Sequence, residues 1–531
     1  MRDFELPGRS VAMSREAMAA TSHPLSTLTA LDVLRAGGTA MDAAVAACAV
    51  QCVVEPGSTG IGGDCFALLS SNGSADVKAF NGSGRAPAAA TVDWYDRAGI
   101  TTLERHSAHA VTVPGAVDAW AQLLRDHGRM SLGEVLQPAI ELAREGYVLT
   151  PRVAYDLAGQ ADILRLDPGV AATFLIDGKP PSAGTVQRQA RLADTLEIIG
   201  CEGADAFYRG SLTDDMVSCL RERGGLHSRD DFETASGEYV TPIRTTFRGR
   251  TVYECPPNGQ GVIALMILNI LERFRPSAKP LDPSRLHIEI EATRLAYAAR
   301  DSHIADLADT GGMVERLLSD RLADELAARI DPDKATVPVA PIASGAEHSD
   351  TVYICVVDKA RNAVSFINSL FHSFGSGLMA PKTGVVFHNR GQGFVLTPGH
   401  PNAIAPRKRP MHTIIPGMVA QNGRVVMPFG VMGGQYQAMG HAHFLSKMFD
   451  DGLDVQEAID LPRLFPLPGT ATVEVEGQLR ADAGAALERR GFNVQAPKTP
   501  IGGAQAIWID WDRGTLSGGS DPRKDGYALG I

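Results

Sequence analysis

Apolar residues recur at the three- and four-residue spacing of an amphipathic helix over long parts of the chain. Ser131 and Glu134 form the Ser-x-x-Glu pattern of a capping box, which marks a helix start. Gly37 and Gly38 follow the first periodic segment and are a natural stop for it. The pattern predicts helices over 24–36, 41–53, 115–160, 286–299 and 313–330.

Short runs rich in β-branched and aromatic residues alternate with turn-like clusters and indicate strands. The expected strands are 66–70, 77–80, 351–357, 363–368, 384–388, 414–421 and 425–429. Helices and strands come in blocks, which favours an α+β sandwich over a doubly wound parallel sheet. Residues 331–350 lack apolar periodicity and are the best linker candidate.

Composition is that of a large globular protein. The chain has 531 residues, of which 44% are hydrophobic and 21% are charged, so a sizeable core can form. The formal net charge of -11 argues against nucleic acid or an anionic membrane surface as a partner. No apolar run is long enough to span a membrane.

The beginning of the chain lacks an apolar run of signal-peptide length, which predicts a cytoplasmic protein. The seven cysteines are consistent with that prediction. Their number is odd, and several lie in apolar runs such as 46–50, so we expect buried free thiols and no disulfides.

Thr351 heads the apolar run Val352–Val357, directly after the loose segment. Cleavage of the Asp350–Thr351 bond would free an α-amino group on the residue that carries the hydroxyl. That amine would act as the base for its own nucleophile, as in N-terminal threonine hydrolases. Taken alone, an internal Asp-Thr before a strand is far more often an ordinary strand start than a cleavage site.

Other motifs narrow the chemistry. Gly433 and Gly434 could bring two backbone N–H groups close to a developing oxyanion. The glycine-rich run 57–63 lacks the Gly-Lys-Ser/Thr ending of a phosphate loop and indicates a turn before a strand. His441 and His443 have no third ligand nearby in sequence, so a structural role is favoured and no metal site is expected.

Seven sequence runs carry a family resemblance: 20–63, 86–91, 113–115, 351–358, 408–410, 433–434 and 520–523. By these runs and their order, the chain resembles the γ-glutamyltransferase family of N-terminal-nucleophile (Ntn) hydrolases from about residue 10 to its end. The resemblance implies a four-layer αββα sandwich made as one proenzyme. It also implies self-cleavage into a large subunit, 1–350, and a small subunit, 351–531, with Asp350 and Thr351 flanking the cut.

The resemblance also assigns roles to single residues. It makes Thr351 the nucleophile, with Gly433 and Gly434 as the oxyanion donors and no cofactor. Ser369 stands where the family has a threonine that supports the nucleophile. The two subunits of one precursor are the expected protein partners, and a homodimer of such heterodimers is left open.

The substrate-binding positions depart from the transferases. Ser83 replaces an arginine that grips the α-carboxylate of the glutamyl group. Phe371, Arg390 and Gly393 stand in place of an asparagine, a glutamine and an aspartate that hold the same end. A pair of serines becomes His412-Thr413.

These changes remove the acid that would bind an ammonium group and introduce a cation. A guanidinium binds a carboxylate well, and a bulky Phe371 should shrink the pocket. The pattern predicts a small carboxylate-bearing amide without an α-amino group. Arg85 lies two residues after Ser83, the position of the missing arginine, so either Arg390 or Arg85 could hold the carboxylate of the substrate. The alternative role for Arg390 is a salt bridge at the protein surface.

Runs 81–87 and 387–391 carry a narrower likeness, to the branch that contains oxamate amidohydrolases and glutathione hydrolase-like proteins. We therefore expect an amidohydrolase that converts oxamate to oxalate and ammonia. One alternative is a glutathione hydrolase or γ-glutamyltransferase. A second alternative is an inactive relative that serves as a binding or scaffold protein.

Overall fold

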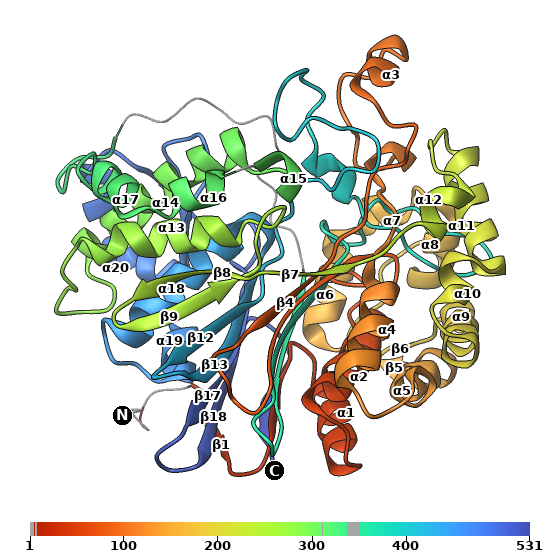
Figure 1. Ribbon diagram of the computed structural model, residues 1–531, viewed down its shortest axis with the longest axis horizontal. Coiled ribbons are helices and arrows are strands. Elements are labelled where there is room, and N and C mark those ends of the chain that lie inside the picture. The colour runs from red at the N-terminus through yellow and green to blue at the C-terminus, as the bar shows by residue number, and fades with distance from the viewer. Residues whose placement is uncertain (1–4, 6–7, 311, 337–350) are drawn as a thin grey trace.

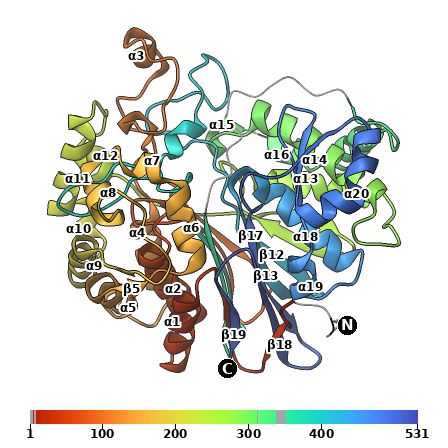
Figure 2. The same ribbon diagram turned by 180° about the vertical axis from the view of Figure 1, so that it is seen from behind.

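Two antiparallel sheets form the centre of the protein. The computed structural model describes residues 5, 8–310, 312–336 and 351–531, and within them each of these sheets has seven strands. The sheets pack face to face between two layers of helices (Figures 1 and 2). This is the predicted αββα sandwich, and the α+β fold class is confirmed.

The first sheet runs in the order β1 (Ala12–Ser14), β18 (Thr515–Ser520), β17 (Gly503–Asp510), β13 (Arg424–Met432), β12 (Gly417–Gln421), β9 (Arg250–Glu254) and β8 (Ile243–Phe247). The second sheet runs in the order β19 (Ala528–Gly530), β2 (Met18–Ala20), β10 (Val352–Val357), β11 (Ala363–Ser369), β3 (Asp64–Ser70), β4 (Lys78–Gly82) and β7 (Glu238–Val240). Smaller sheets join β14 (Leu464–Pro466) to β15 (Thr472–Val475) and β16 (Asn493–Gln495), and β5 (Tyr147–Val148) to β6 (Val186–Gln187).

One helical layer covers the second sheet. It comprises α1 (Pro24–Arg35), α2 (Ala40–Val54), α4 (Ala116–His127), α5 (Leu132–Glu145), α6 (Pro151–Gly159), α7 (Ala161–Leu164), α8 (Pro168–Phe174), α9 (Ala190–Glu202), α10 (Asp205–Tyr208), α11 (Ser211–Glu222) and α12 (Arg229–Glu233). The short helix α3 (Val92–Arg97) lies on an arm that projects beyond the sandwich (Figure 1).

The other layer covers the first sheet. It comprises α13 (Gly261–Glu272), α14 (Pro283–His303), α15 (Leu307–Thr310), α16 (Met313–Leu317), α17 (Asp320–Ala327), α18 (Gln437–Phe449), α19 (Val455–Asp460) and α20 (Gly477–Arg489). Three 3-10 turns, η1 (Ala108–Ala110), η2 (Arg390–Gly393) and η3 (Gly434–Tyr436), lie in connections.

Strand β10 shows why the chain folds into these layers. Successive side chains of a strand point to opposite faces. Tyr353 and Cys355 therefore join the core between the two sheets, whereas Ile354 and Val356 join the core beneath the α2 layer. Both faces are buried, which accounts for the unbroken apolar run after Thr351.

Helix ends follow the local sequence signals. The predicted capping box of α5 is present, with Ser131 and Glu134 bonding each other's backbone N–H groups. Helix α2 has a second one between Thr39 and Asp42. Helix α1 ends at Arg35, and Gly37 takes a positive φ directly after it.

Some predicted elements were wrong. Residues 384–388 form no strand; Gly384 turns the chain with a φ of +69°, and only an isolated bridge joins Val386 to Met379. The strand predicted over 414–421 begins at Gly417. All seven cysteines are free in the described chain, and six are buried, but Cys201 is exposed.

Strands from both sides of the expected cut lie in both sheets. β10 pairs with β2 and β11, and β11 pairs with β3, so residues before 337 and after 350 share one sheet. Asp350 lies outside the described residues, so the boundary between subunits stays a prediction. Within the described chain, no helix combines the length and apolarity that crossing a membrane requires.

Candidate active site

Thr351 and Ser369 lie side by side because β10 and β11 are antiparallel. Val352 is opposite Asn368, which brings the residue before one strand next to the residue ending the other. The hydroxyl oxygens of Thr351 and Ser369 are 3.1 Å apart, and both side chains are buried. The structure therefore brings the predicted nucleophile and its predicted supporting hydroxyl into hydrogen-bond contact.

The glycine-rich run 57–63 packs against the end of β11 at Asn368 and Ser369. A side chain at Gly63 would lie 2.4 Å from the carbonyl oxygen of Ser369, and one at Gly62 would lie 2.2 Å from that of Val386. The Asn368 side chain donates to Thr59 Oγ1 at 2.8 Å. The run is a close-packed turn before β3, as predicted, and its glycines permit close backbone approach.

Contacts continue from Ser369 to the predicted substrate residues. Ser369 Oγ accepts the backbone N–H of Phe371 at 2.9 Å. The Phe371 ring centroid lies 4.1 Å from the guanidinium carbon of Arg390. Arg390 Nη1 in turn donates to Thr413 Oγ1 at 3.0 Å. Thr351, Ser369, Phe371, Arg390 and Thr413 thus form one continuous series of contacts.

Arg390 is fully buried, so the alternative of a surface salt bridge is wrong. Its Nε and Nη2 atoms have no hydrogen-bond partner in the described chain. Burial lowers the pKa of Arg390 to about 9, while the charge of Asp64 opposes the shift. A buried cation with two unpartnered donors is costly, and an anionic acceptor would satisfy it.

Arg85 lies in a different environment. Its guanidinium faces Glu238 and Asp306 and donates to the Arg407 carbonyl, beside a separate small cavity. Two carboxylates already neutralise Arg85, whereas Arg390 forms no ion pair with a carboxylate among the described residues.

Asp64 is a site residue that the sequence analysis missed. It is fully buried at the start of β3, opposite Ser369. Its carboxylate accepts from His412 Nε2 at 3.0 Å and lies 3.3 Å from His388 Nδ1. Burial would raise the pKa of Asp64, but the two histidines hold that pKa well below its usual range.

His412 belongs to this buried cluster and does not line the cavity described below. Burial, together with the charge of Arg390, lowers the pKa of His412 to about 3. Its Nε2 faces the Asp64 carboxylate and its Nδ1 accepts the Ile414 N–H at 3.4 Å, so the neutral ring carries its hydrogen on Nε2.

We expect His412→Gln to weaken the loss of stability in acid. Histidine in the unfolded chain takes up a proton near pH 6.5, whereas folded His412 does so only near pH 3. Neutral His412 therefore contributes fully to the free energy of unfolding above pH 6.5, and this contribution is lost as the pH falls from 6.5 towards 3. Glutamine keeps an N–H donor for Asp64 but does not titrate.

The difference should appear in urea unfolding between pH 6 and pH 4. There the free energy of unfolding of the wild type should fall more steeply than that of His412→Gln, by up to about 1.4 kcal/mol per pH unit. Parallel pH dependences for the two proteins would contradict a neutral, buried His412.

Gly433 and Gly434 follow β13 and precede α18. Their φ angles are +115° and +54°, a region that favours glycine. A side chain at Gly433 would also meet the Cα of Gly502 at 2.9 Å. The pair forms a tight turn close to a helix N-terminus, where backbone N–H groups and the helix dipole favour negative charge.

Gln260 was also missed, although it joins the glycine turn to the Arg390 side. Its Nε2 donates to the carbonyl oxygens of Thr413 at 2.8 Å and Gly434 at 3.0 Å. Its Oε1 accepts from Arg300 Nη1 at 3.2 Å, which fixes the orientation of the amide because arginine only donates. No local sequence motif marks these contacts, since their partners lie 40 to 174 residues away.

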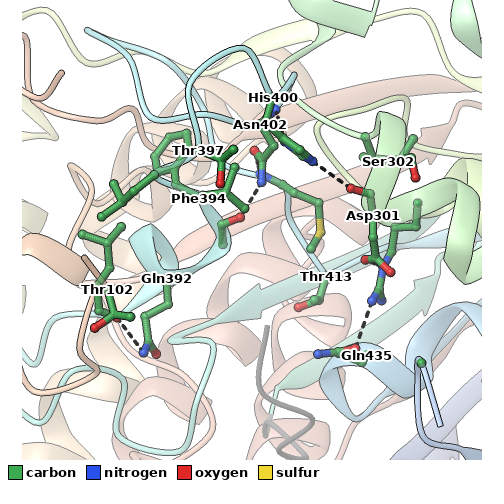
Figure 3. A pocket seen from close by; sticks show the side chains of 18 of the residues that line it. Thr102, Asp301, Ser302, Gln392, Phe394, Thr397, His400, Asn402, Thr413 and Gln435 are labelled. Carbon is green, nitrogen blue, oxygen red and sulfur yellow. Dashed lines mark hydrogen bonds and ion pairs between the residues drawn. The ribbon is translucent and has the colours of Figure 1, made fainter. Parts of the chain in front are cut away.

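A cavity of about 1130 Å³ opens beside these residues (Figure 3). Phe371, Thr413 and Gln435 are among the residues that line it, whereas Arg390 and Thr351 do not line it. Loop residues such as Phe394 and His400, and Asp301 of α14, form other parts of its wall. Its volume slightly exceeds the usual range for pockets that hold drug-sized ligands.

The remaining predicted positions have structural partners. Ser83 is buried and hydrogen-bonds Asn81 and Asn258, while Gly393 lines the cavity. His441 Nδ1 pairs with Glu254 at 2.6 Å, and His443 Nδ1 pairs with Glu289 at 2.8 Å. Across the residues that the structure describes, no three potential ligands gather into a metal site.

The chain is similar to known proteins over nearly its whole length. A model of the family described as Gamma-glutamyltranspeptidase matches residues 26–531. The Glutathione hydrolase-like YwrD proenzyme of Bacillus subtilis (strain 168) is 37% identical over 97% of this chain and 98% of its own length. The Oxamate amidohydrolase proenzyme of Klebsiella pneumoniae subsp. pneumoniae is 35% identical over 98% of this chain and 99% of its own length. The crystal structure of cephalosporin acylase from Bacillus halodurans superimposes with a TM-score of 0.92 at 37% identity, covering 100% of this chain and 98% of that one.

Proposed function

Because this chain belongs to the gamma-glutamyltranspeptidase family and is an Ntn hydrolase, we propose that it is a self-processing amidohydrolase for small carboxylate-bearing amides. Oxamate is the first candidate substrate, and its products would be oxalate and ammonia. The observation that carries the proposal is the buried guanidinium of Arg390, two of whose donor atoms have no hydrogen-bond partner in the described chain. Contacts through Phe371 and Ser369 connect Arg390 to Thr351.

Processing supplies the catalytic groups. Cleavage between Asp350 and Thr351 gives a large subunit, 1–350, and a small subunit that begins with Thr351. The new α-amine takes the proton of the Thr351 hydroxyl while Oγ1 attacks the amide carbon. Ser369 Oγ, 3.1 Å away, orients that hydroxyl. The amine then passes the proton to the departing ammonia, and water hydrolyses the acyl-enzyme.

The charge that develops on the carbonyl oxygen needs donors. Gly433 and Gly434 supply two backbone N–H groups at the start of α18, and the turn is already folded. Donors fixed in advance lower the barrier because they need no reorganisation during the reaction. Gln260 donates hydrogen bonds to the carbonyl oxygens of Gly434 and Thr413. It thereby fixes the glycine turn relative to Thr413, which contacts Arg390.

Substrate recognition falls to Arg390. The free Nε and Nη2 atoms are the two donors of one guanidinium edge, the arrangement that matches both oxygens of a carboxylate. Ser83 and Gly393 offer no charge for the amino-acid end of a glutamyl group. A carboxylate without an α-amino group therefore suits the site better than glutamate does.

Hydrolysis of glutathione or transfer of a γ-glutamyl group is the second candidate, and the cavity volume favours it. About 1130 Å³ is far more than oxamate fills, whereas a peptide-like leaving group would occupy much of it. One relative is named Oxamate amidohydrolase proenzyme, and another is named Glutathione hydrolase proenzyme.

The two activities are separated by assaying the purified, processed protein on both substrates. We expect ammonia release from oxamate, with far slower p-nitroaniline release from γ-glutamyl-p-nitroanilide. The reverse ranking would replace the first candidate by the second. An uncut 56.4 kDa chain that is inactive on both would instead support the role of a binding or scaffold protein.

A further inference from the structure

The Phe371 ring contacts Arg390 and also lines the cavity. Phe371 is partly exposed, whereas Arg390 is fully buried and does not line the cavity. The guanidinium carbon is 4.1 Å from the ring centroid, which is close enough for a cation–π contact. Among the described residues that line the cavity, Phe371 and Thr413 contact the guanidinium, so the ring forms part of the wall that separates Arg390 from a ligand there.

The contact leaves Arg390 incompletely satisfied. Nη1 donates to Thr413, but Nε and Nη2 are buried without hydrogen-bond partners in the described chain. A ring face attracts a cation but accepts hydrogen bonds only weakly, so it replaces a carboxylate poorly. The covered state holds the charge in place without fully compensating it.

Phe371 is held in this position by its neighbours. Its φ of +79° is unusual for a bulky residue. Its N–H bonds Ser369 Oγ, and its ring stacks on His372 at 4.5 Å with an interplanar angle of 13°. His372 is itself fixed, since its N–H donates to Asn389 Oδ1 at 3.0 Å. Backbone strain of this kind concentrates at functional sites.

We propose that Phe371 is a specificity-determining cover of a carboxylate site, displaced by the carboxylate that then binds Arg390 Nε and Nη2. The inference deepens the proposed function and rests on it. A side-chain rotation moves the ring while the N–H bond to Ser369 persists. The nucleophile contact between Ser369 and Thr351 is thereby kept during entry, and only groups able to replace the ring gain access.

The test measures how fast phenylglyoxal, an arginine reagent, labels Arg390 in the processed protein, with labelled peptides quantified by mass spectrometry. Phe371→Gly removes the ring and suits the positive φ, so the fold should be retained. We expect labelling of Arg390 to rise severalfold in Phe371→Gly and to fall again when oxalate is added. Phe371→Leu, which keeps an apolar cover, should label like the wild type.

Two controls separate a local cover from general loosening. Phe394→Ala removes another ring from the same cavity and should leave the labelling of Arg390 unchanged. Arg300 is equally buried, lines the cavity and bonds Gln260 and Gln435, so its labelling serves as the reference within each sample.

Each outcome decides the proposal. Unchanged labelling of Arg390 in Phe371→Gly would overturn the cover, as would an equal rise at Arg300. A rise that oxalate does not suppress would overturn carboxylate binding at this site. Protection by oxalate in a protein that does not hydrolyse oxamate would support the covered carboxylate site while rejecting oxamate as the substrate.

Discussion

Replacement of Thr351 by alanine should abolish both self-cleavage and amide hydrolysis. The wild type should separate into fragments 1–350 and 351–531, and N-terminal sequencing of the smaller should read Thr-Val-Tyr-Ile. The alanine variant should remain a single chain. The reason is that one hydroxyl, 3.1 Å from Ser369 Oγ, serves as nucleophile in both steps. Loss of a nucleophile typically lowers turnover by several orders of magnitude.

Thr351→Ser is the matched control, because it keeps the hydroxyl and removes only a methyl group. It should retain part of the processing and part of the activity. An alanine variant that is cut at the same bond, or that hydrolyses amides at the wild-type rate, would rule out Thr351 as the nucleophile. A smaller fragment with a different first residue would do the same.

Arg390→Gln should raise KM for a carboxylate-bearing amide by about ten- to a hundredfold, the value of a charge-assisted hydrogen bond to a buried group. Glutamine is shorter than arginine and carries no charge, so it cannot replace both donors of the open edge. Processing should be preserved, since the Asp350–Thr351 bond contains no free carboxylate that needs Arg390.

The comparison substrate is the corresponding neutral diamide, in which an amide replaces the carboxylate. Its turnover should change little in Arg390→Gln. Equal losses on the charged and neutral substrates would show that Arg390 only maintains the structure. Arg85→Gln provides a second control, and it should leave KM unchanged because Arg85 already pairs with two carboxylates beside a different cavity.

Many helices and strands of the fold could be predicted from the sequence because the patterns that specify them lie within a few neighbouring residues. Strand β10 is an unbroken apolar run buried on both faces, and the α5 capping box is complete within four residues. The pairing of Thr351 with Ser369 follows from the antiparallel register. The false strand at 384–388 has the right residue types, but Gly384 turns the chain where a strand would continue.

The chemistry of the site depends on contacts that no local pattern reveals. Asp64 and His412 meet across 348 residues, and Gln260 reaches Gly434 across 174. Arg390 lies in a loop that suggests exposure, yet Thr413 and Phe371 enclose it. Sequence analysis predicted that Phe371 narrows the pocket. It could not predict that the ring packs on the guanidinium of Arg390.

The interleaving of strands in the second sheet bears on how the mature protein can be made. β10 and β11 are flanked by β2 and β3, so each piece created by the cut lacks its neighbours. The intact precursor folds as one molecule, with those partners held at high effective concentration by the connecting chain. After scission, reassembly from separated pieces becomes a bimolecular reaction between incomplete sheets. An enzyme cut at the proposed bond would therefore persist only through slow unfolding, and denaturation that a precursor could reverse would become irreversible for the cut protein.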